Sequence, residues 1–285
     1  MSAQVIDGKA VAAKLREQVA IDAAAFTEQY GRPPGLATIL IGDDPASAVY
    51  VASKQRSCAE AGIEGFSFNL PADATREQAI ATIEEANANP AISGIICQLP
   101  VPDQLDGVEL TGLVDPMKDV DGLTTTSAGL LALGRPGLRP CTPRGVMMLL
   151  DEVGVELEGA EAVVIGRSNL FGKPMGQLLL ERSATVTICH SRTKDLAATC
   201  SRADVLIAAV GRPRMVEANF VKPGAVVIDV GINRVDDVLC GDVDFEAVSE
   251  VASAITPVPG GVGPMTIACL LDNTVIAARM AAEQA

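Results

Sequence analysis

Aromatic side chains are scarce in this chain, and tryptophan is absent. Among the 285 residues, aromatics make up 3%, whereas hydrophobic residues make up 48%. The core must therefore be built mainly from Ala, Val, Ile and Leu, which suits a buried parallel sheet covered by helices. Charged residues make up 20%, a globular composition, and the length allows one large domain or two ordinary ones.

Basic residues are too few for a polyanion-binding protein. The chain has 22 Lys and Arg against 36 Asp and Glu, which gives a formal net charge of −14. Neutralising a phosphate backbone or an anionic membrane surface needs clustered basic residues, so we expect neither partner. The sequence also lacks a run of 18 apolar residues and a signal-like N-terminus, and therefore predicts no membrane span.

Metal-binding and disulfide spacings are absent as well. There is a single His, and the seven Cys are odd in number and show no C-x-x-C pair. Several Cys lie within apolar, strand-like runs. This pattern is typical of reduced, buried thiols in a reducing compartment, so we expect a cytoplasmic protein without a metal.

Short apolar runs alternate with longer amphipathic stretches, which predicts βαβ units and a parallel sheet. Residues 100–142 interrupt the alternation with clustered Gly and Pro, and we expect the cleft and crossover between two domains there. The predicted fold class is α/β, with a catalytic domain at 1–139, completed by a helix at about 265–285, and a Rossmann-like domain at 140–264. The expected strands are 36–41, 66–70, 92–99, 162–165, 185–189, 205–210 and 225–230, and the expected helices are 9–30, 45–61, 75–87 and 265–282.

A dinucleotide site is indicated where the strand at 162–165 runs into a glycine-containing loop and a helix. Gly166 allows a sharp turn, Gly172 allows close backbone approach, and Pro174 suits a first helical turn. The free N–H groups at such a helix start favour a diphosphate. Arg167 and Ser168 replace the usual second glycine, so the loop alone is a weak signal.

The end of the next strand favours NADP over NAD. An NAD enzyme usually has an acid there to hold the ribose diol. This chain instead has His190, Ser191 and Arg192, and a hydroxyl and a guanidinium suit a 2′-phosphate. We therefore predict that Ser191 and Arg192 contact the cofactor, although an ordinary polar strand exit is the alternative. His190 lies at the adenosine end, which argues against a catalytic base.

Polar residues follow strands in the first half too. Tyr50 and Lys54 are four residues apart, on one face of a predicted helix. A Lys in a cleft can lose some of its preference for the charged form and exchange protons, but the spacing alone favours a solvated surface Lys over a packed Tyr. Gln98 ends another strand, and Asp121 lies in an acidic, Gly- and Pro-containing turn.

Together these segments resemble one family, the bifunctional methylenetetrahydrofolate dehydrogenase/methenyltetrahydrofolate cyclohydrolases. The similarity spans residues 50 to 264 in the family's order. The motifs that carry it are Tyr50-x-x-x-Lys54, Gly94-Ile95-Ile96-Cys97-Gln98-Leu99-Pro100, Lys118-Asp119-Val120-Asp121-Gly122, Pro140-Cys141-Thr142-Pro143, Gly166-Arg167-Ser168-Asn169-x-x-Gly172-Lys173-Pro174, Asp229-Val230-Gly231-Ile232-Asn233 and Thr256-Pro257-Val258-Pro259-Gly260-Gly261-Val262-Gly263-Pro264.

The resemblance implies NADP-dependent oxidation of methylenetetrahydrofolate, then hydrolysis to 10-formyltetrahydrofolate, in a homodimer that serves one-carbon metabolism and purine biosynthesis. It implies that Lys54 transfers protons in hydrolysis, that Gln98 tunes its charge, that Tyr50 borders the folate and that Asp121 binds the pterin. The implied substrate contacts also include Pro259, Gly260 and Gly261, and the implied cofactor contacts are Gly166, Arg167, Ser168, Ser191, Arg192 and Ile232.

Three alternatives stay open at this point. After Asp121-Gly122 the family often has His-Pro-x-Asn, whereas this chain has Thr124-Thr125-Thr126-Ser127. That departure allows a dehydrogenase with weak or absent cyclohydrolase activity. The others are a shikimate-type NADP dehydrogenase, which usually has a more conventional glycine loop, and a non-catalytic dinucleotide sensor, which would not need Lys54, Gln98 and Asp121 together.

Overall fold

The chain forms two structural units, each assembled from separate stretches of sequence. The computed structural model describes residues 2–284, apart from the side chains of residues 45, 46 and 48–50. One unit contains residues 14–141 and 267–285, and the other contains residues 1–13 and 142–266. We call them the lysine unit, since it contains Lys54, and the glycine-loop unit, since it contains Gly166. The division differs from the predicted one at the N-terminus, because the first 13 residues lie with the glycine-loop unit.

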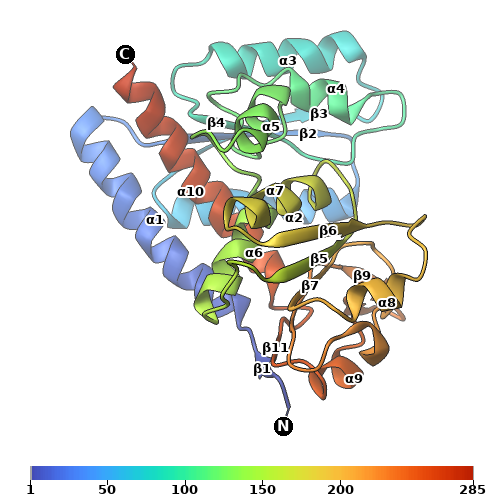
Figure 1. Ribbon diagram of the computed structural model, residues 1–285. Coiled ribbons are helices and arrows are strands. Elements are labelled where there is room, and N and C mark those ends of the chain that lie inside the picture. Colours follow the sequence, from blue (N-terminus) through green and yellow to red (C-terminus); the bar gives the residue numbers. More distant parts are fainter. Residues whose placement is uncertain (1, 285) are drawn as a thin grey trace. The chain divides into compact units, whose positions relative to one another are not determined.

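The lysine unit is built on a three-stranded parallel sheet (Figure 1). Its strands are β2 (Gly35–Ile41), β3 (Glu64–Leu70) and β4 (Gly94–Cys97), in the order β3-β2-β4. Helices α2 (Pro45–Glu60) and α3 (Arg76–Ala88) make the crossovers. Because β2 has β3 on one side and β4 on the other, the strand order reverses at β2. The crevice at the carboxyl ends of β2 and β4 is therefore the expected place for a ligand.

Local signals set the limits of these elements. Thr75 caps α3 in a capping box, accepting from the Gln78 N–H while the Gln78 side chain accepts from the Thr75 N–H. This satisfies two backbone donors at the helix start. Strand β2 is buried along almost its whole length, and Ile39 packs with Ile83 of α3 and Ile95 of β4 in one apolar cluster.

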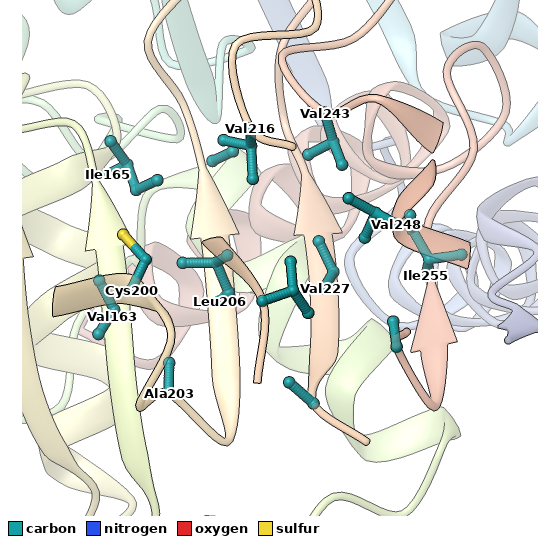
Figure 2. Packing of buried hydrophobic residues seen from close by; sticks show 14 of the residues in the cluster. Val163, Ile165, Cys200, Ala203, Leu206, Val216, Val227, Val243, Val248 and Ile255 are labelled. Atoms are coloured by element: carbon teal, nitrogen blue, oxygen red, sulfur yellow. The ribbon is translucent and has the colours of Figure 1, made fainter. Parts of the chain in front are cut away.

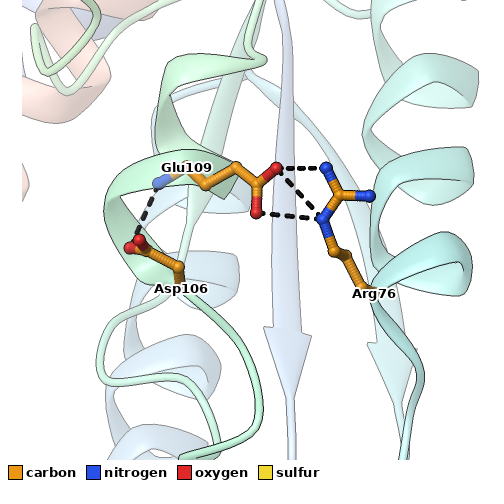
Figure 3. Close-up of polar contacts among 3 residues, drawn as sticks. All are labelled: Arg76, Asp106 and Glu109. Carbon is orange, nitrogen blue, oxygen red and sulfur yellow. Dashed lines mark hydrogen bonds and ion pairs between the residues drawn. The ribbon is translucent and has the colours of Figure 1, made fainter.

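The Gly- and Pro-rich stretch contains helices that the alternation of runs did not predict. They are α4 (Gly107–Gly112), α5 (Thr125–Ala132) and the start of α6 (Cys141–Glu152). Asp106 caps α4 by accepting from the Glu109 N–H, and Arg76 of α3 forms an ion pair with the Glu109 carboxylate (Figure 3). This exposed pair connects α4 to α3 but adds little to stability.

Two long helices lie near the two ends of the sequence, α1 (Gly8–Tyr30) and α10 (Val262–Glu283). In the lysine unit they are tied together by an ion pair 2.7 Å long between Arg279 and Asp22. Helix α10 is 22 residues long with a mean hydropathy of 1.3, so by length and composition it could cross a membrane. Core helices meet the same criteria, and 56% of this segment is buried within the protein.

The glycine-loop unit has a six-stranded parallel sheet in the order β1-β11-β8-β7-β5-β6. Its face carries an aliphatic cluster to which alternate residues of neighbouring strands contribute, including Val163 and Ile165 of β5, Leu206 of β7 and Val227 of β8 (Figure 2). The order reverses at β5, between β6 and β7. The strands are β1 (Gln4–Val5), β5 (Glu161–Ile165), β6 (Thr185–Cys189), β7 (Val205–Ala208), β8 (Val226–Asp229) and β11 (Ala254–Ile255).

Smaller elements complete this unit. The strand pattern alone did not predict β1 and β11, which are too short to show periodicity, or the antiparallel hairpin of β9 and β10. The remaining elements are α7 (Gly172–Glu181), α8 (Leu196–Cys200), the 3-10 turn η1 (Ala218–Phe220), β9 (Asn233–Val235), β10 (Val238–Cys240) and α9 (Phe245–Ser249).

Candidate functional site

Lys54 is buried at the carboxyl edge of the lysine unit's sheet. It lies on α2, which follows β2, and only 6% of the residue is exposed. Its Nζ donates to Oε1 of Gln98 over 2.8 Å. Gln98 directly follows β4, and its own backbone N–H donates to Ile39 of β2. The structure therefore brings together two residues that are 44 positions apart, at the point where the strand order reverses.

The orientation of the Gln98 amide is fixed. Its Nε2 donates to the carbonyl oxygen of Leu99 over 2.7 Å, so Oε1 is the atom that faces Lys54. The buried ammonium thus has an uncharged acceptor as its hydrogen-bond partner. This arrangement stabilises the position of Nζ without the full charge stabilisation that a carboxylate would give.

Burial lowers the pKa of Lys54, and the nearby Asp121 carboxylate is the main group that opposes this shift. Burial raises the pKa of Asp121, while Lys54 and a hydrogen bond with Cys141 act in the opposite direction. Desolvation therefore moves both groups toward their neutral forms. A lysine with a lowered pKa next to a carboxyl group is suited to proton transfer near neutral pH.

A second acid, Asp119, organises the turn that carries Asp121. Asp119 is buried, and its carboxylate accepts from the backbone N–H groups of Leu123 and Thr124 and from the Ser127 hydroxyl, at 2.6–3.0 Å. Within this acidic turn, Asp121 alone was predicted to be a site residue. The run of polar residues after Gly122 is the signal that could have identified Asp119, because they supply its donors.

The Thr124–Ser127 departure from the family pattern has a local structural role. Thr124 is the N-cap of α5, and its side chain accepts from the Ser127 N–H over 3.2 Å. Both residues also donate to Asp119. The segment therefore holds the acidic turn in place, and the Lys54–Gln98 hydrogen bond forms in its presence.

Cys141 and Asn273 are residues near Lys54 and Asp121 that the sequence analysis did not assign to the site. The buried Cys141 thiol donates to the Val120 carbonyl, and Asn273 of α10 donates to the same carbonyl over 2.8 Å. Both thus hold the backbone next to Asp121. Tyr50 lies on α2, one turn before Lys54, but its side chain is outside the described part of the structure.

In the glycine-loop unit, Gly166 and Gly172 bring the loop and the helix start into close contact. Gly166 has a φ of +132°, and a Cβ there would meet the Ala209 carbonyl oxygen at 2.4 Å. A Cβ on Gly172 would meet the Gly166 carbonyl oxygen at 2.1 Å. Helix α7 has no side chain capping its N-terminus. The Lys173 N–H donates to the Ser168 carbonyl and Pro174 has no N–H, so it is mainly the positive end of the helix dipole that favours an anion there. Arg167 and Ser168 are exposed on this loop.

The loop after β6 presents Ser191 and Arg192 to solvent. His190 stabilises the conformation of this loop. Its side-chain Nδ1 accepts from the Arg192 backbone N–H over 3.1 Å, and its backbone N–H donates to the Thr193 hydroxyl over 2.9 Å. Strands β6 and β5 are neighbours, so this loop and the Gly166 turn lie at the same edge of one sheet. The two predicted parts of the NADP site are therefore adjacent, and His190 serves the loop's conformation.

The other predicted contacts are also on the glycine-loop unit. Ile232 follows β8 and is 54% exposed. Pro259 is exposed, whereas Gly261 is buried and donates to the Pro257 carbonyl. Within residues 2–284, no group of three or more His, Cys, Asp or Glu could hold a metal ion.

Comparison with known proteins gives consistent matches along the chain. Residues 6–121 match the catalytic domain, and residues 140–282 the NAD(P)-binding domain, of tetrahydrofolate dehydrogenase/cyclohydrolase. Bifunctional protein FolD 2 of Frankia alni is 61% identical over 283 residues, which are 99% of this chain and 98% of that protein.

Solved structures agree. The FolD methylenetetrahydrofolate dehydrogenase/cyclohydrolase of Campylobacter jejuni is 44% identical with a TM-score of 0.96, covering 98% of this chain and all of the other. The corresponding enzyme of Trypanosoma brucei, solved with NADP and an inhibitor, is 38% identical with a TM-score of 0.95, covering 99% of each chain. The chain therefore belongs to the tetrahydrofolate dehydrogenase/cyclohydrolase family.

Proposed function

We propose that this protein oxidises 5,10-methylenetetrahydrofolate with NADP⁺ and then hydrolyses the product to 10-formyltetrahydrofolate. In the first step the one-carbon bridge loses a hydride and becomes a methenyl cation. In the second, water adds to that carbon and one C–N bond of the ring breaks; the released nitrogen takes up one proton of the water, and the other proton is lost to solvent. The buried Lys54–Gln98 pair carries the proposal, because hydrolysis requires a group that can accept and return a proton.

Lys54 takes the proton-transfer role in this scheme. Its neutral form accepts a proton from the attacking water, and the resulting ammonium returns a proton to the leaving nitrogen. The lowered pKa makes the neutral form accessible, and Gln98 Oε1 accepts from Nζ without adding a charge. Asp121 offers carboxylate oxygens that match the adjacent N–H donors of a pterin.

The residues of the glycine-loop unit fit NADP. The Gly166 turn and the uncapped start of α7 suit the diphosphate, and Ser191 with Arg192 suits the 2′-phosphate. NADP⁺ supplies the hydride acceptor when it is bound. The protein's part in this step is positioning, since the cofactor carries the redox chemistry.

The alternatives are weaker. Family membership excludes a shikimate-type dehydrogenase, and a dinucleotide sensor would not need a buried Lys54. A dehydrogenase without cyclohydrolase activity was suggested by the Thr124–Ser127 departure, but that segment binds Asp119 and leaves the Lys54–Gln98 pair intact.

One assay tests both activities. Purified protein is given methylenetetrahydrofolate with NADP⁺, and the absorbances of NADPH and of methenyltetrahydrofolate are followed together. We expect NADPH to form while methenyltetrahydrofolate stays low. Formation of NADPH with a stoichiometric rise of methenyltetrahydrofolate would instead show a dehydrogenase alone.

We also propose a cytoplasmic homodimer that supplies formyl groups to reactions such as those of purine biosynthesis, with no nucleic-acid or membrane partner. All seven Cys are buried thiols outside any disulfide, which suits a reducing compartment, and the net charge of −14 disfavours polyanions. Among the described residues, β3 pairs only with β2, and an unpaired edge is suited to a second copy. Sedimentation analysis at several concentrations tests the dimer.

A further inference from the structure

Asp242 is a completely buried acid that has no part in the scheme above. It lies between β10 and α9, and its carboxylate accepts four hydrogen bonds. The backbone N–H groups of Val210, Gly211 and Arg212 donate over 2.6, 3.0 and 2.8 Å, and Asn233 Nδ2 donates over 2.9 Å. Four is about the full acceptor capacity of a carboxylate.

A second buried acid, Asp229, holds Asp242 in place. The Asp229 carboxylate accepts from the backbone N–H groups of Gly231, Asp242 and Val243, each over 2.9 Å. Room for this contact depends on Gly241, because a Cβ there would lie 1.8 Å from Asp229 Oδ2. The two acids therefore form a chain in which Asp229 orients the backbone of Asp242.

The donors to Asp242 come from the carboxyl ends of two adjacent strands. Residues 210–212 follow β7, and Asn233 follows β8. Strand β7 also pairs with β5, and the Gly166 turn after β5 is in close contact with Ala209. This is the edge of the sheet where the order reverses and where a dinucleotide binds in such folds.

Ile232 connects these acids to the cofactor site. Its two neighbours in sequence are each bonded to one acid: the Gly231 N–H donates to Asp229, and the Asn233 side chain donates to Asp242. The Ile232 side chain itself is exposed. An apolar side chain held toward solvent by anchors on both sides is preorganised for a ligand, and preorganisation lowers the ordering cost of binding.

We propose that Asp242 is a positioning residue for NADP, which fixes the loops after β7 and β8 in their binding conformation without contacting the cofactor. The proposal rests on the function proposed above. It means that the affinity for NADP depends in part on a buried acid bonded to the loop after β7, whereas Ser191 and Arg192 lie on the loop after β6, two positions along the sheet. Because Lys54, Gln98 and Asp121 belong to the other unit, it also predicts that hydrolysis is independent of Asp242.

The variant Asp242→Asn tests this. One amide oxygen replaces two carboxylate oxygens, and the amide NH₂ then faces N–H donors, so at least two of the four hydrogen bonds are lost. We expect the Kd for NADP⁺, measured by calorimetry, to rise at least ten-fold, with a matching rise in KM for NADP⁺. Hydrolysis of methenyltetrahydrofolate without cofactor should stay within two-fold of the wild type.

Asp244→Asn is the matched control. It removes the same charge two residues away, where the side chain caps α9 by accepting from the Ala247 N–H, and Asn caps helices as well as Asp does. We expect both activities and the NADP⁺ affinity to stay within two-fold. An equal loss of NADP⁺ affinity in the two variants would overturn the proposal, because the effect would then be one of charge alone.

Two other results would overturn it: unchanged NADP⁺ affinity in Asp242→Asn, or a parallel loss of NADP⁺ affinity and hydrolysis in a variant that still folds. If Asp242→Asn does not fold, Asn233→Ala removes a single donor, and unchanged NADP⁺ affinity in that variant would refute the proposal. Wild-type protein that binds no NADP⁺ would contradict the proposed function itself, which is a different failure.

Discussion

Replacing Gln98 by Glu provides the sharpest test of the proton-transfer role of Lys54. In the wild type, Nζ of Lys54 lies 2.8 Å from Oε1 of Gln98. A carboxylate at that distance would attract the ammonium by about 6 kcal/mol at an effective dielectric constant of about 20. The substitution should therefore raise the pKa of Lys54 and reduce the fraction in the neutral form.

A second contact changes in the variant. The second carboxylate oxygen would replace Nε2, which donates to the Leu99 carbonyl over 2.7 Å in the wild type. Losing that hydrogen bond and bringing two acceptor oxygens together costs about 1–3 kcal/mol. This cost is the same whether Lys54 is charged or neutral, so it lowers the stability of the variant and does not oppose the rise in the pKa of Lys54. At a fixed pH below that pKa, the higher pKa lowers the neutral fraction, and hydrolysis loses part of the ~10²–10⁴-fold that acid–base catalysis contributes.

The assay is the decay of methenyltetrahydrofolate absorbance across pH, after subtraction of the uncatalysed rate. We expect the Gln98→Glu profile to move to higher pH and its rate near neutrality to fall by about two orders of magnitude. Gln98→Met, which removes the acceptor without adding charge, should not move the profile to higher pH. Dehydrogenase activity, which needs no proton from Lys54, reports on folding in both variants. Identical pH profiles for the Glu and Met variants would refute the assignment of Lys54.

Three further predictions concern single side chains. Lys54→Met should abolish hydrolysis, while some dehydrogenase activity persists and methenyltetrahydrofolate accumulates. Lys54→Arg should also fail to hydrolyse the substrate, because a guanidinium does not deprotonate near neutral pH. Hydrolysis by Lys54→Met at the wild-type rate would exclude a proton-transfer role for Lys54. Asp121→Asn should weaken folate binding and both activities with Tm within a few degrees of the wild type, whereas a large drop in Tm with normal folate affinity would indicate a structural turn. Arg192→Ala should weaken NADP⁺ binding by ~1–3 kcal/mol and leave NAD⁺ binding nearly unchanged in calorimetry, and equal losses for both cofactors would show that Arg192 does not contact the 2′-phosphate.

Much of the fold could be predicted because its signals are local. The scarcity of aromatics and the aliphatic runs predicted buried parallel strands, and β2, β5 and β6 lie where those runs are. The helix predicted at 75–87 begins at Thr75, which is the N-cap of α3 in the structure. The glycine loop at 166–172 was recognisable since tight turns leave few choices of residue.

Pairings between distant segments could not be predicted, because nothing in a short window encodes them. Strands β1 and β11 have two residues each, and they are strands only because they pair with neighbouring strands. Gln4 and Val5 of β1 lie beside Ala254 and Ile255 of β11. For this reason the first 13 residues lie with the glycine-loop unit, contrary to the predicted boundary.

The sequence by itself determined the types of residue available for chemistry and, through motif order, the family. Tertiary structure decided which of them meet. Lys54 is an ordinary surface-type residue by spacing, and only the parallel pairing of β2 with β4 buries it against Gln98. Likewise, the sequence around Asp242 is that of an ordinary turn, and only the fold places four donors, from the segments that follow β7 and β8, within hydrogen-bond distance of its carboxylate. The physical reason is that desolvation and hydrogen bonding depend on neighbours in space, and Lys54 and Gln98, for example, are 44 positions apart in the sequence.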